Sequence, residues 1–386
     1  MTPAARVQAA IEILDQVLDG APAERALTGW ARRSRFAGSK DRAAVRDHVF
    51  DAIRCKRSYA ALGGALSGRG LMLGALRAAA EAPEDTFTGV GHAPAVLDPA
   101  EQAAGAPARE AAERLDIPDW IWPLFTSSLA EQAEAVARAL QSRAPVHLRV
   151  NRARNTRDAA ILALARDGIT AEPHPAAATA LTVTDGSRKI RNSQAYLRGM
   201  VELQDAASQA VVETINLPPG TTVLDYCAGG GGKSLALAAH ADVQVTAHDA
   251  DPGRMTDLPD RAARAGVFVP TLLTEALENK QFDVVLVDAP CSGSGAWRRS
   301  PDAKWRLTPG RLDAFCALQA DILARALHHV APGGTLVYAT CSLLREENQR
   351  QVEQFLQAHA GWRRSLERVW LPPQGTDGFF AAHLTR

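Results

Sequence analysis

The second half of the sequence predicts an α/β fold built on a doubly wound parallel sheet. From about residue 205 onward, short runs rich in β-branched residues alternate with helical stretches. Such alternation is typical of a parallel sheet that is covered by helices on both faces. Ligands of these sheets bind at the carboxyl ends of the strands, so the chemistry is expected where the runs stop. The strand candidates are TTVLDYC (221–227), VQVTAHD (243–249), VFVPTLL (267–273), DVVLVDA (283–289) and GTLVYAT (334–340).

Four parts are expected along the chain. They are a helical domain (1–65), a helical and linker region rich in Gly, Ala and Pro (66–140), a small α+β unit (141–204) and the catalytic domain (205–386). The N-terminal stretch has the spacing of an amphipathic helix, because Val7, Ile11, Leu14 and Leu18 fall on one face. In the small unit, strand candidates 146–151 and 180–185 flank the helical stretch 157–168.

Bulk composition leaves the partner open. The chain has 43 basic and 43 acidic residues, so net charge gives no reason to expect nucleic acid. No apolar run reaches the ~20 residues that span a bilayer, and the start lacks a secretory pattern. A cytoplasmic protein without membrane association is therefore expected. The five cysteines are odd in number and form no CxxC pair, which argues against both a disulfide framework and a metal site.

Basic residues nevertheless cluster locally, in residues 25–57 and again in 149–157. Such clusters are either ordinary solvated surface or phosphate-binding surface. The second interpretation gains weight only if the catalytic half acts on nucleic acid. The candidate RNA contacts are Arg32, Arg33, Arg35, Arg149, Arg152, Arg298 and Arg299.

The first strand candidate ends in a glycine-rich loop, DYCAGGGGKS (225–234), that runs directly into a helix. Four consecutive glycines either make a tight turn or let the backbone approach a ligand closely, and a helix N-terminus favours a carboxylate. A phosphate loop would need glycine where Cys227 stands. The dinucleotide fingerprint, begun at Gly229, would need glycine where Ser234 stands. Neither rival motif is met.

An acidic residue, Asp249, ends the second strand candidate about twenty residues after the loop. A carboxylate there can accept hydrogen bonds from both hydroxyls of a ribose, although turns use Asp as well. Together the loop and Asp249 suggest a cofactor that combines adenosine with an amino-acid tail.

Two cysteines follow neighbouring strands. The fourth strand candidate ends in DAPC (288–291) and the fifth in ATCS (339–342), so Cys291 and Cys341 are expected over one site. Thiols suit methylation of cytosine, because C5 is a weak nucleophile until a thiolate adds to C6 and makes C5 enamine-like. Asp288 is placed to stabilise the charge that develops at N3.

These stretches resemble the Sun/Fmu family of bacterial ribosomal RNA cytosine-5 methyltransferases, the RsmB-like members of the NOP2/Sun class. The matching segments are DYCAGGGGKS, DAPCSGSGAWRRSPDAKW, YATCSLLREEN and DGFFAAHL, with looser similarity in GMVELQDAASQAVV, HLRVNRARNTRDA and SKDRAAVRDHVFDAIR. The resemblance implies a Rossmann-like class I methyltransferase sheet, a ferredoxin-like α+β subdomain and NusB-like RNA-binding helices. It also implies S-adenosylmethionine as cofactor and RNA as partner, with 16S ribosomal RNA the first candidate, in a monomeric enzyme.

Residue by residue, the resemblance implies that Cys341 is the nucleophile and that Cys291 is needed for product release. Where the family loop usually reads CAAPGGK, Gly229 and Gly230 replace Ala-Pro, and Glu275 stands where the family usually has Asp. The implied cofactor contacts are Cys227, Ala228, Gly229, Gly230, Gly231, Gly232, Lys233, Asp249, Glu275 and Asp288.

Three alternatives remain open. A DNA cytosine-5 methyltransferase would use Cys291 as nucleophile and would leave Cys341 without a role. Transfer RNA is another possible substrate of the same chemistry. A non-catalytic ribosome-assembly factor would keep the fold and bind RNA only, and the intact Cys291, Cys341 and Asp288 argue against it.

Overall fold

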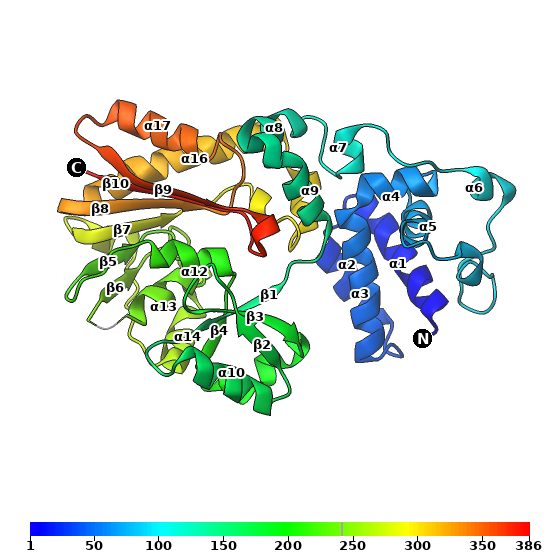
Figure 1. The fold of residues 1–386 in the computed structure, drawn as a ribbon, viewed down its shortest axis with the longest axis horizontal. Coiled ribbons are helices and arrows are strands. Elements are labelled where there is room, and N and C mark those ends of the chain that lie inside the picture. Colours follow the sequence, from blue (N-terminus) through cyan, green and yellow to red (C-terminus); the bar gives the residue numbers. More distant parts are fainter. Residues whose placement is uncertain (241) are drawn as a thin grey trace. The chain divides into compact units, whose positions relative to one another are not determined.

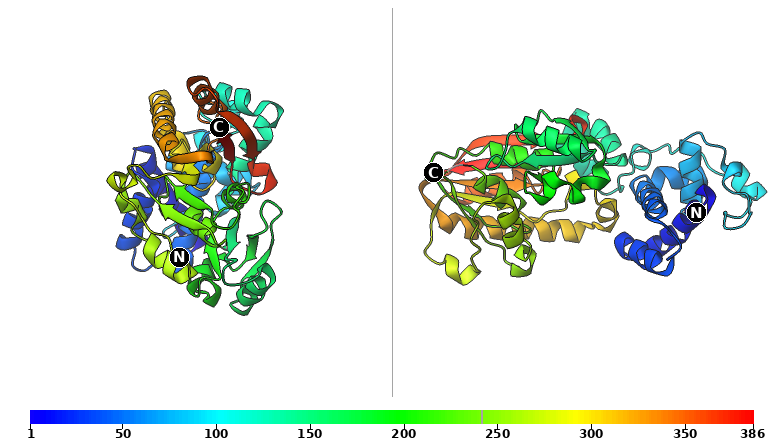
Figure 2. Two further views of the ribbon diagram at one scale, coloured as in Figure 1. Left: turned by 90° about the vertical axis from the view of Figure 1, so that its left-hand side faces the viewer. Right: turned by 90° about the horizontal axis from the view of Figure 1, so that it is seen from below.

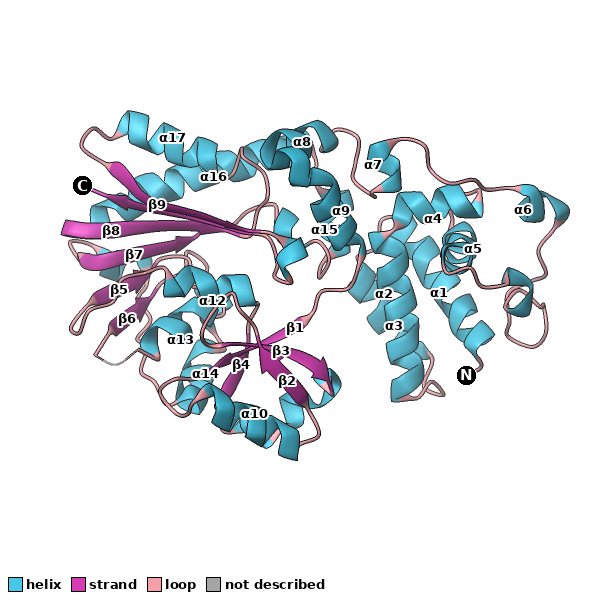
Figure 3. Cartoon of the chain, in the orientation of Figure 1, coloured by secondary structure: helices cyan, strands magenta, loops and turns pink. Residues whose placement is uncertain are grey.

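The structure is a computed structural model that describes residues 1–240 and 242–386. These residues form two compact units. The helical unit consists of Met1–Arg143 and Trp297–Leu307, and the mixed unit of Ala144–Ala296 and Thr308–Arg386. Figure 3 colours strands magenta, and they occur in the mixed unit. The finer division into four parts stays a prediction.

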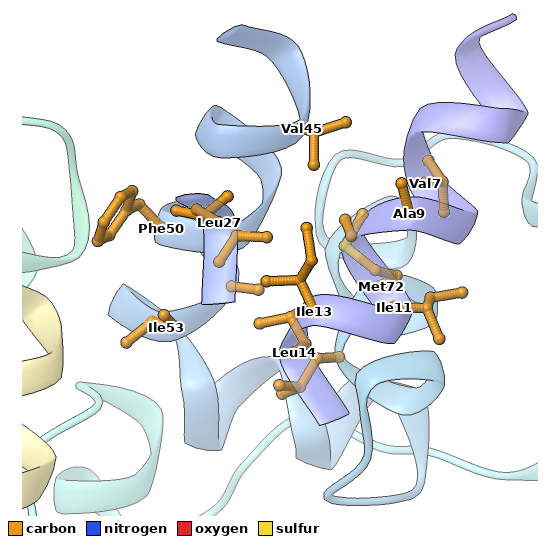
Figure 4. Packing of buried hydrophobic residues seen from close by; sticks show 14 of the residues in the cluster. Val7, Ala9, Ile11, Ile13, Leu14, Leu27, Val45, Phe50, Ile53 and Met72 are labelled. Atoms are coloured by element: carbon orange, nitrogen blue, oxygen red, sulfur yellow. The ribbon is translucent and has the colours of Figure 1, made fainter. Parts of the chain in front are cut away.

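The helical unit is built around its N-terminal helix. α1 begins at Pro3, where the Thr2 hydroxyl accepts a hydrogen bond from the Ala5 N–H. Val7, Ile11 and Leu14 of its predicted apolar face are buried, and Leu18 is partly buried. Figure 4 shows Val7, Ile13 and Leu14 packed among side chains of the neighbouring helices. The helices are α1 (Pro3–Leu18), α2 (Ala23–Arg33), α3 (Ser39–Arg54), α4 (Lys56–Gly63), α5 (Gly68–Ala78), α6 (Pro99–Ala103), α7 (Ala111–Arg114), α8 (Trp122–Leu129), α9 (Ala133–Gln141) and α15 (Pro301–Arg306).

Glycines bring α4 and α5 into backbone contact. A Cβ on Gly63 would lie 1.8 Å from the carbonyl oxygen of Gly70, and one on Gly74 would lie 1.9 Å from that of Tyr59. Helices approach this closely only where no side chain intervenes. The region 66–140, interpreted above as helical and linker sequence, begins with the helix α5, whose Leu71, Met72 and Leu73 lie in the core.

The first part of the mixed unit is a small antiparallel sheet with strand order β2-β3-β1-β4. The two predicted strands and the predicted helix are present, whereas β2 and β4 are short and were not predicted. The elements are β1 (Val146–Val150), α10 (Arg157–Arg166), β2 (Thr170–Pro173), β3 (Ala180–Asp185), α11 (Gln194–Leu197) and β4 (Val201–Leu203).

The larger sheet has the order β6-β5-β7-β8-β10-β9. β6, β5, β7 and β8 run parallel, and β10 pairs antiparallel with both β8 and β9. The strands are β5 (Thr222–Asp225), β6 (Gln244–Ala247), β7 (Phe282–Asp288), β8 (Val330–Thr340), β9 (Arg363–Trp370) and β10 (Phe379–Thr385).

Helices cover both faces of this sheet (Figures 1 and 2). Alternate residues of β7 show why both faces are apolar: Val285 and Val287 belong to one buried cluster, and Val284 and Leu286 to another. The first cluster includes residues of α16 (Pro309–Ala326) and α17 (Gln349–Ala358), and the second includes residues of α12 (Ala206–Glu213), α13 (Gly232–Ala238) and α14 (Leu258–Ala265). The doubly wound fold predicted from sequence is confirmed.

One predicted strand is reduced to a bridge. In VFVPTLL, only Thr271 pairs with the sheet, through Ala247. Pro270 lacks the N–H that a ladder requires, which limits pairing there. Among the described helices, none is long and apolar enough to cross a lipid bilayer.

Candidate active site

The glycine-rich loop between β5 and α13 is held against the acid that follows β6. Asp249 is buried, and its Oδ2 accepts a hydrogen bond of 2.9 Å from the Gly229 N–H. Arg254 forms an ion pair with the same carboxylate at 3.2 Å. Gly230, by contrast, is exposed. The loop thus presents the Gly230 backbone to solvent beside a fixed carboxylate.

Gly231 is the glycine of this loop whose conformation matters most. Its φ is +76°, and a Cβ would lie 2.2 Å from Leu258 Cδ1. We expect Gly231→Ala to lower the free energy of unfolding by about 1–3 kcal/mol, through backbone strain and overlap. Gly230→Ala is the matched control, because its Cβ would meet only the flexible Arg261 guanidinium at 3.1 Å. Urea unfolding measures both, and equal losses would contradict this account.

Lys233 links the same loop to the end of β7. Its side chain is 6% exposed, and its ammonium group donates a hydrogen bond of 2.6 Å to Asp288 Oδ2. The ammonium also lies 4.9 Å from the centre of the Phe379 ring. The carboxylate compensates the buried cation and remains partly open to solvent, with 33% of the Asp288 side chain exposed. Two predicted site residues are therefore paired.

Asp225, the last residue of β5, was not predicted as a functional residue. It is buried beneath the loop, and its Oδ2 accepts a hydrogen bond of 2.6 Å from the Ser234 hydroxyl. Burial raises the pKa of this carboxyl to about 7. The hydrogen bond between Asp225 and Ser234 fixes the first turn of α13 to the end of β5.

The two predicted cysteines, Cys291 and Cys341, are in contact. Their sulfur atoms lie 3.4 Å apart, with Cys291 in the loop after β7 and Cys341 directly after β8. The Gly295 N–H donates a 2.9 Å hydrogen bond to the Cys341 carbonyl, which ties the loops together. A hydrogen bond with Cys341, together with burial, raises the pKa of the Cys291 thiol. Cys291 is therefore held as a thiol beside its partner.

A further loop supports this pair. Gly378, in the predicted DGFF segment before β10, donates a 2.9 Å hydrogen bond to the Gly295 carbonyl. A Cβ on Gly378 would lie 2.7 Å from the Gly295 Cα. This contact explains the glycine in DGFF: the backbone there packs directly on the Cys291 loop.

The other candidate residues differ in exposure. Glu275 lies on an exposed 3-10 turn, Thr274–Leu277, after Thr271. Arg149 and Arg298 are buried, at 4% and 3% exposure, so we do not retain them as phosphate contacts. Arg149 instead donates hydrogen bonds to Gln204 and to the Gly232 carbonyl. The exposed candidates are Arg32, Arg33, Arg35, Arg152 and Arg299.

Fold and site together define a Rossmann-like class I methyltransferase: a glycine loop faces an acid on the neighbouring strand, at the carboxyl edge of a parallel sheet completed by β10 and β9. Comparison with known proteins agrees. A family model described as 16S rRNA methyltransferase RsmB/F matches residues 212–385, and one for the ferredoxin-like domain of RsmF/B-like methyltransferases matches residues 117–188. The chain belongs to this RsmB/F family, the Sun/Fmu family that the sequence motifs resemble.

Individual relatives support the assignment. Ribosomal RNA small subunit methyltransferase B of Xanthomonas campestris is 36% identical over 290 residues, which cover 70% of this chain and 66% of the relative. The match thus spans slightly less than two thirds of that protein. A methyltransferase homologue from Pyrococcus horikoshii is 26% identical with a TM-score of 0.62, covering 72% of this chain and 97% of its own. The structure of PH0851 shares the fold along the whole chain, with a TM-score of 0.78, 24% identity and coverage of 100% and 99%.

Proposed function

We propose that this protein transfers the methyl group of S-adenosylmethionine to C5 of a cytosine in small-subunit ribosomal RNA, through a covalent bond between Cys341 and C6. The observation that carries the proposal is the 3.4 Å approach of Cys341 and Cys291 at the ends of neighbouring parallel strands. Membership of the RsmB/F family supports the RNA class, and the name of the Xanthomonas relative supports the small subunit.

The residues present fit S-adenosylmethionine. Each Asp249 oxygen accepts one backbone N–H, from Gly229 or Asp251. Its remaining partner is the side chain of Arg254, which is 55% exposed and could give way to a ribose hydroxyl. Gly230 leaves the loop open to a close approach, and the partly exposed Asp288 can accept from an amino group. When bound, the cofactor supplies an electrophilic methyl group. Cys227–Lys233, Asp249 and Asp288 would hold it, and Glu275 stays a proposed contact.

The chain's own residues would act on the cytosine. The Cys341 thiol loses its proton to solvent and its sulfur bonds to C6, which makes C5 nucleophilic. N3 takes up a proton from solvent in this step, and the Asp288 carboxylate accepts a hydrogen bond from the N3–H and so stabilises the charge that develops there. After methylation the C5 proton passes to solvent, the C5–C6 double bond re-forms and the bond from C6 to the Cys341 sulfur breaks. Cys291 assists this last step as a thiol donor beside the departing sulfur.

A direct test is methylation of RNA from a strain that lacks the protein. With S-adenosylmethionine and purified protein, 16S ribosomal RNA should gain 5-methylcytidine at a defined position, found by bisulfite sequencing. Methylation of transfer RNA or DNA instead would replace the substrate class. RNA binding without methyl transfer would favour an assembly factor.

The exposed arginines at the end of α2 are proposed to contact phosphates. We expect the double reversal Arg32→Glu and Arg33→Glu to lower RNA affinity and to flatten its salt dependence, because each lost phosphate contact reduces counterion release. Arg138→Glu is the matched control, since Arg138 is exposed in the same unit but pairs with Glu134 at 2.5 Å. Filter binding at several salt concentrations measures this, and equal behaviour of both variants would contradict the proposed contact.

A further inference from the structure

A buried carboxylate lies behind the two cysteines. Glu347 is fully buried, in the loop between β8 and α17. Its Oε1 accepts a hydrogen bond of 2.8 Å from the Ser292 N–H, and its Oε2 one of 2.5 Å from the Ser292 hydroxyl. Ser292 follows Cys291 directly. Both oxygens of the carboxylate therefore hold the loop that carries the first thiol.

The same carboxylate also holds the second loop. Oε2 accepts a 2.5 Å hydrogen bond from the hydroxyl of Ser342, the residue after Cys341. Ser342 Oγ lies 3.0 Å from Ser294 Oγ, and the Ser294 hydroxyl accepts a hydrogen bond of 2.7 Å from the Leu343 N–H. One carboxylate thus joins the residues that follow both cysteines.

Gln319 of α16 completes the arrangement. Its amide donates to Glu347 Oε1 at 3.0 Å and to the Pro290 carbonyl, just before Cys291, at 2.9 Å. Glu347 is surrounded by hydroxyl and amide donors, and it forms no ion pair with another described residue. Burying a charge without a counterion is unfavourable unless hydrogen bonds compensate it, so this carboxylate is an unusual choice for simple packing.

We propose that Glu347 is a positioning residue that fixes Cys291 and Cys341 at their close spacing by holding the two following serines on one carboxylate. The effect of Glu347 on catalysis rests on the proposed function. Its effect on the spacing of the two thiols does not depend on that function. Two hydrogen bonds from Ser292 and one from Ser342 end on the same carboxylate group, so the two loops cannot separate without breaking at least one of these bonds.

The positioning role of Glu347 can be tested with phenylarsine oxide, a trivalent arsenical that bridges two neighbouring thiols. Two As–S bonds form and one water leaves, without oxidation or reduction. The wild-type protein should take up one equivalent at Cys291 and Cys341, identified by mass spectrometry. Cys291→Ala and Cys341→Ala should lose this uptake.

Glu347→Ala should weaken arsenical binding at least tenfold, while iodoacetamide still alkylates each thiol singly. Its rate of covalent bonding to RNA should fall about 100-fold, as expected for a misplaced nucleophile. Glu347→Gln should restore both readouts in large part, because an amide of the same shape still engages the serines. Glu346→Gln is the control: this neighbouring carboxylate pairs with Arg350 at 3.3 Å instead.

Wild-type arsenical affinity and RNA bonding in Glu347→Ala would overturn the proposal. If that variant does not fold, Ser292→Ala and Ser342→Ala can replace it, because each removes one hydroxyl donor to the carboxylate. Each should weaken arsenical binding several-fold. Unchanged binding in both serine variants would also overturn the proposal. Normal arsenical results with no 5-methylcytidine from the wild type would reject the proposed function and leave the positioning role standing.

Discussion

Replacing Cys341 by alanine should abolish methyl transfer and leave no covalent bond to RNA. Cys341 follows β8 directly, and its sulfur is the atom proposed to add to C6. Without it, C5 keeps the low nucleophilicity of a free cytosine. Loss of product measured with radiolabelled S-adenosylmethionine, and a clean denaturing gel, are the expected readouts.

Replacing Cys291 by alanine should have the opposite effect on the denaturing gel, where a covalent protein–RNA complex should appear. Attack and methylation should proceed, but the departing Cys341 sulfur would lose its neighbouring thiol donor at 3.4 Å. A protein–RNA complex that survives denaturing electrophoresis should therefore accumulate. Complex formation by Cys341→Ala and none by Cys291→Ala would reverse the two roles.

Replacing Asp288 by asparagine should lower the rate of methyl transfer by about 100- to 1,000-fold, the usual cost of removing a group that stabilises developing charge. It should also lower the free energy of unfolding by about 3 kcal/mol, because the buried Lys233 ammonium would lose the carboxylate that lies 2.6 Å from it.

A double variant separates these two effects. Lys233→Met with Asp288→Asn removes the buried cation together with its partner, so most of the lost stability should return while activity stays low. Urea unfolding and initial rates measure the two quantities. Recovery of the rate in the double variant would show that Asp288 acts only through Lys233.

The parallel strands could be predicted because β5, β7 and β8 are largely buried on both faces, and all four are short runs rich in apolar and β-branched residues, although β6 lies at the sheet edge and is partly exposed. β9 and β10 could not. β9 (RRSLERVW) is charged and largely exposed at the sheet edge, and β10 was noted only as the DGFFAAHL motif. The α4–α5 contact was missed for another reason: glycine gives no apolar period, although it permits the closest packing.

Both cysteines and the glycine loop were expected from the sequence at strand ends. In the structure the two sulfur atoms lie 3.4 Å apart, and the loop is bonded to Asp249. The sequence could not show that Glu347 is buried, because REEN before a helix is typical of an exposed helix start. The exposure of individual arginines could not be predicted from the sequence either. Arg149 is buried on β1, where it bonds to Gln204 and the Gly232 carbonyl, whereas Arg152, two residues beyond that strand, is exposed.

The central claim is that Cys341, rather than Cys291, bonds to the base. It is tested most directly with 16S ribosomal RNA transcribed with 5-fluorocytidine. Fluorine at C5 cannot leave as a proton does, so the covalent complex persists after methyl transfer. Digestion and mass spectrometry should locate the modified nucleotide on the peptide that contains Cys341. A modified peptide containing Cys291, with Cys341 free, would contradict the account.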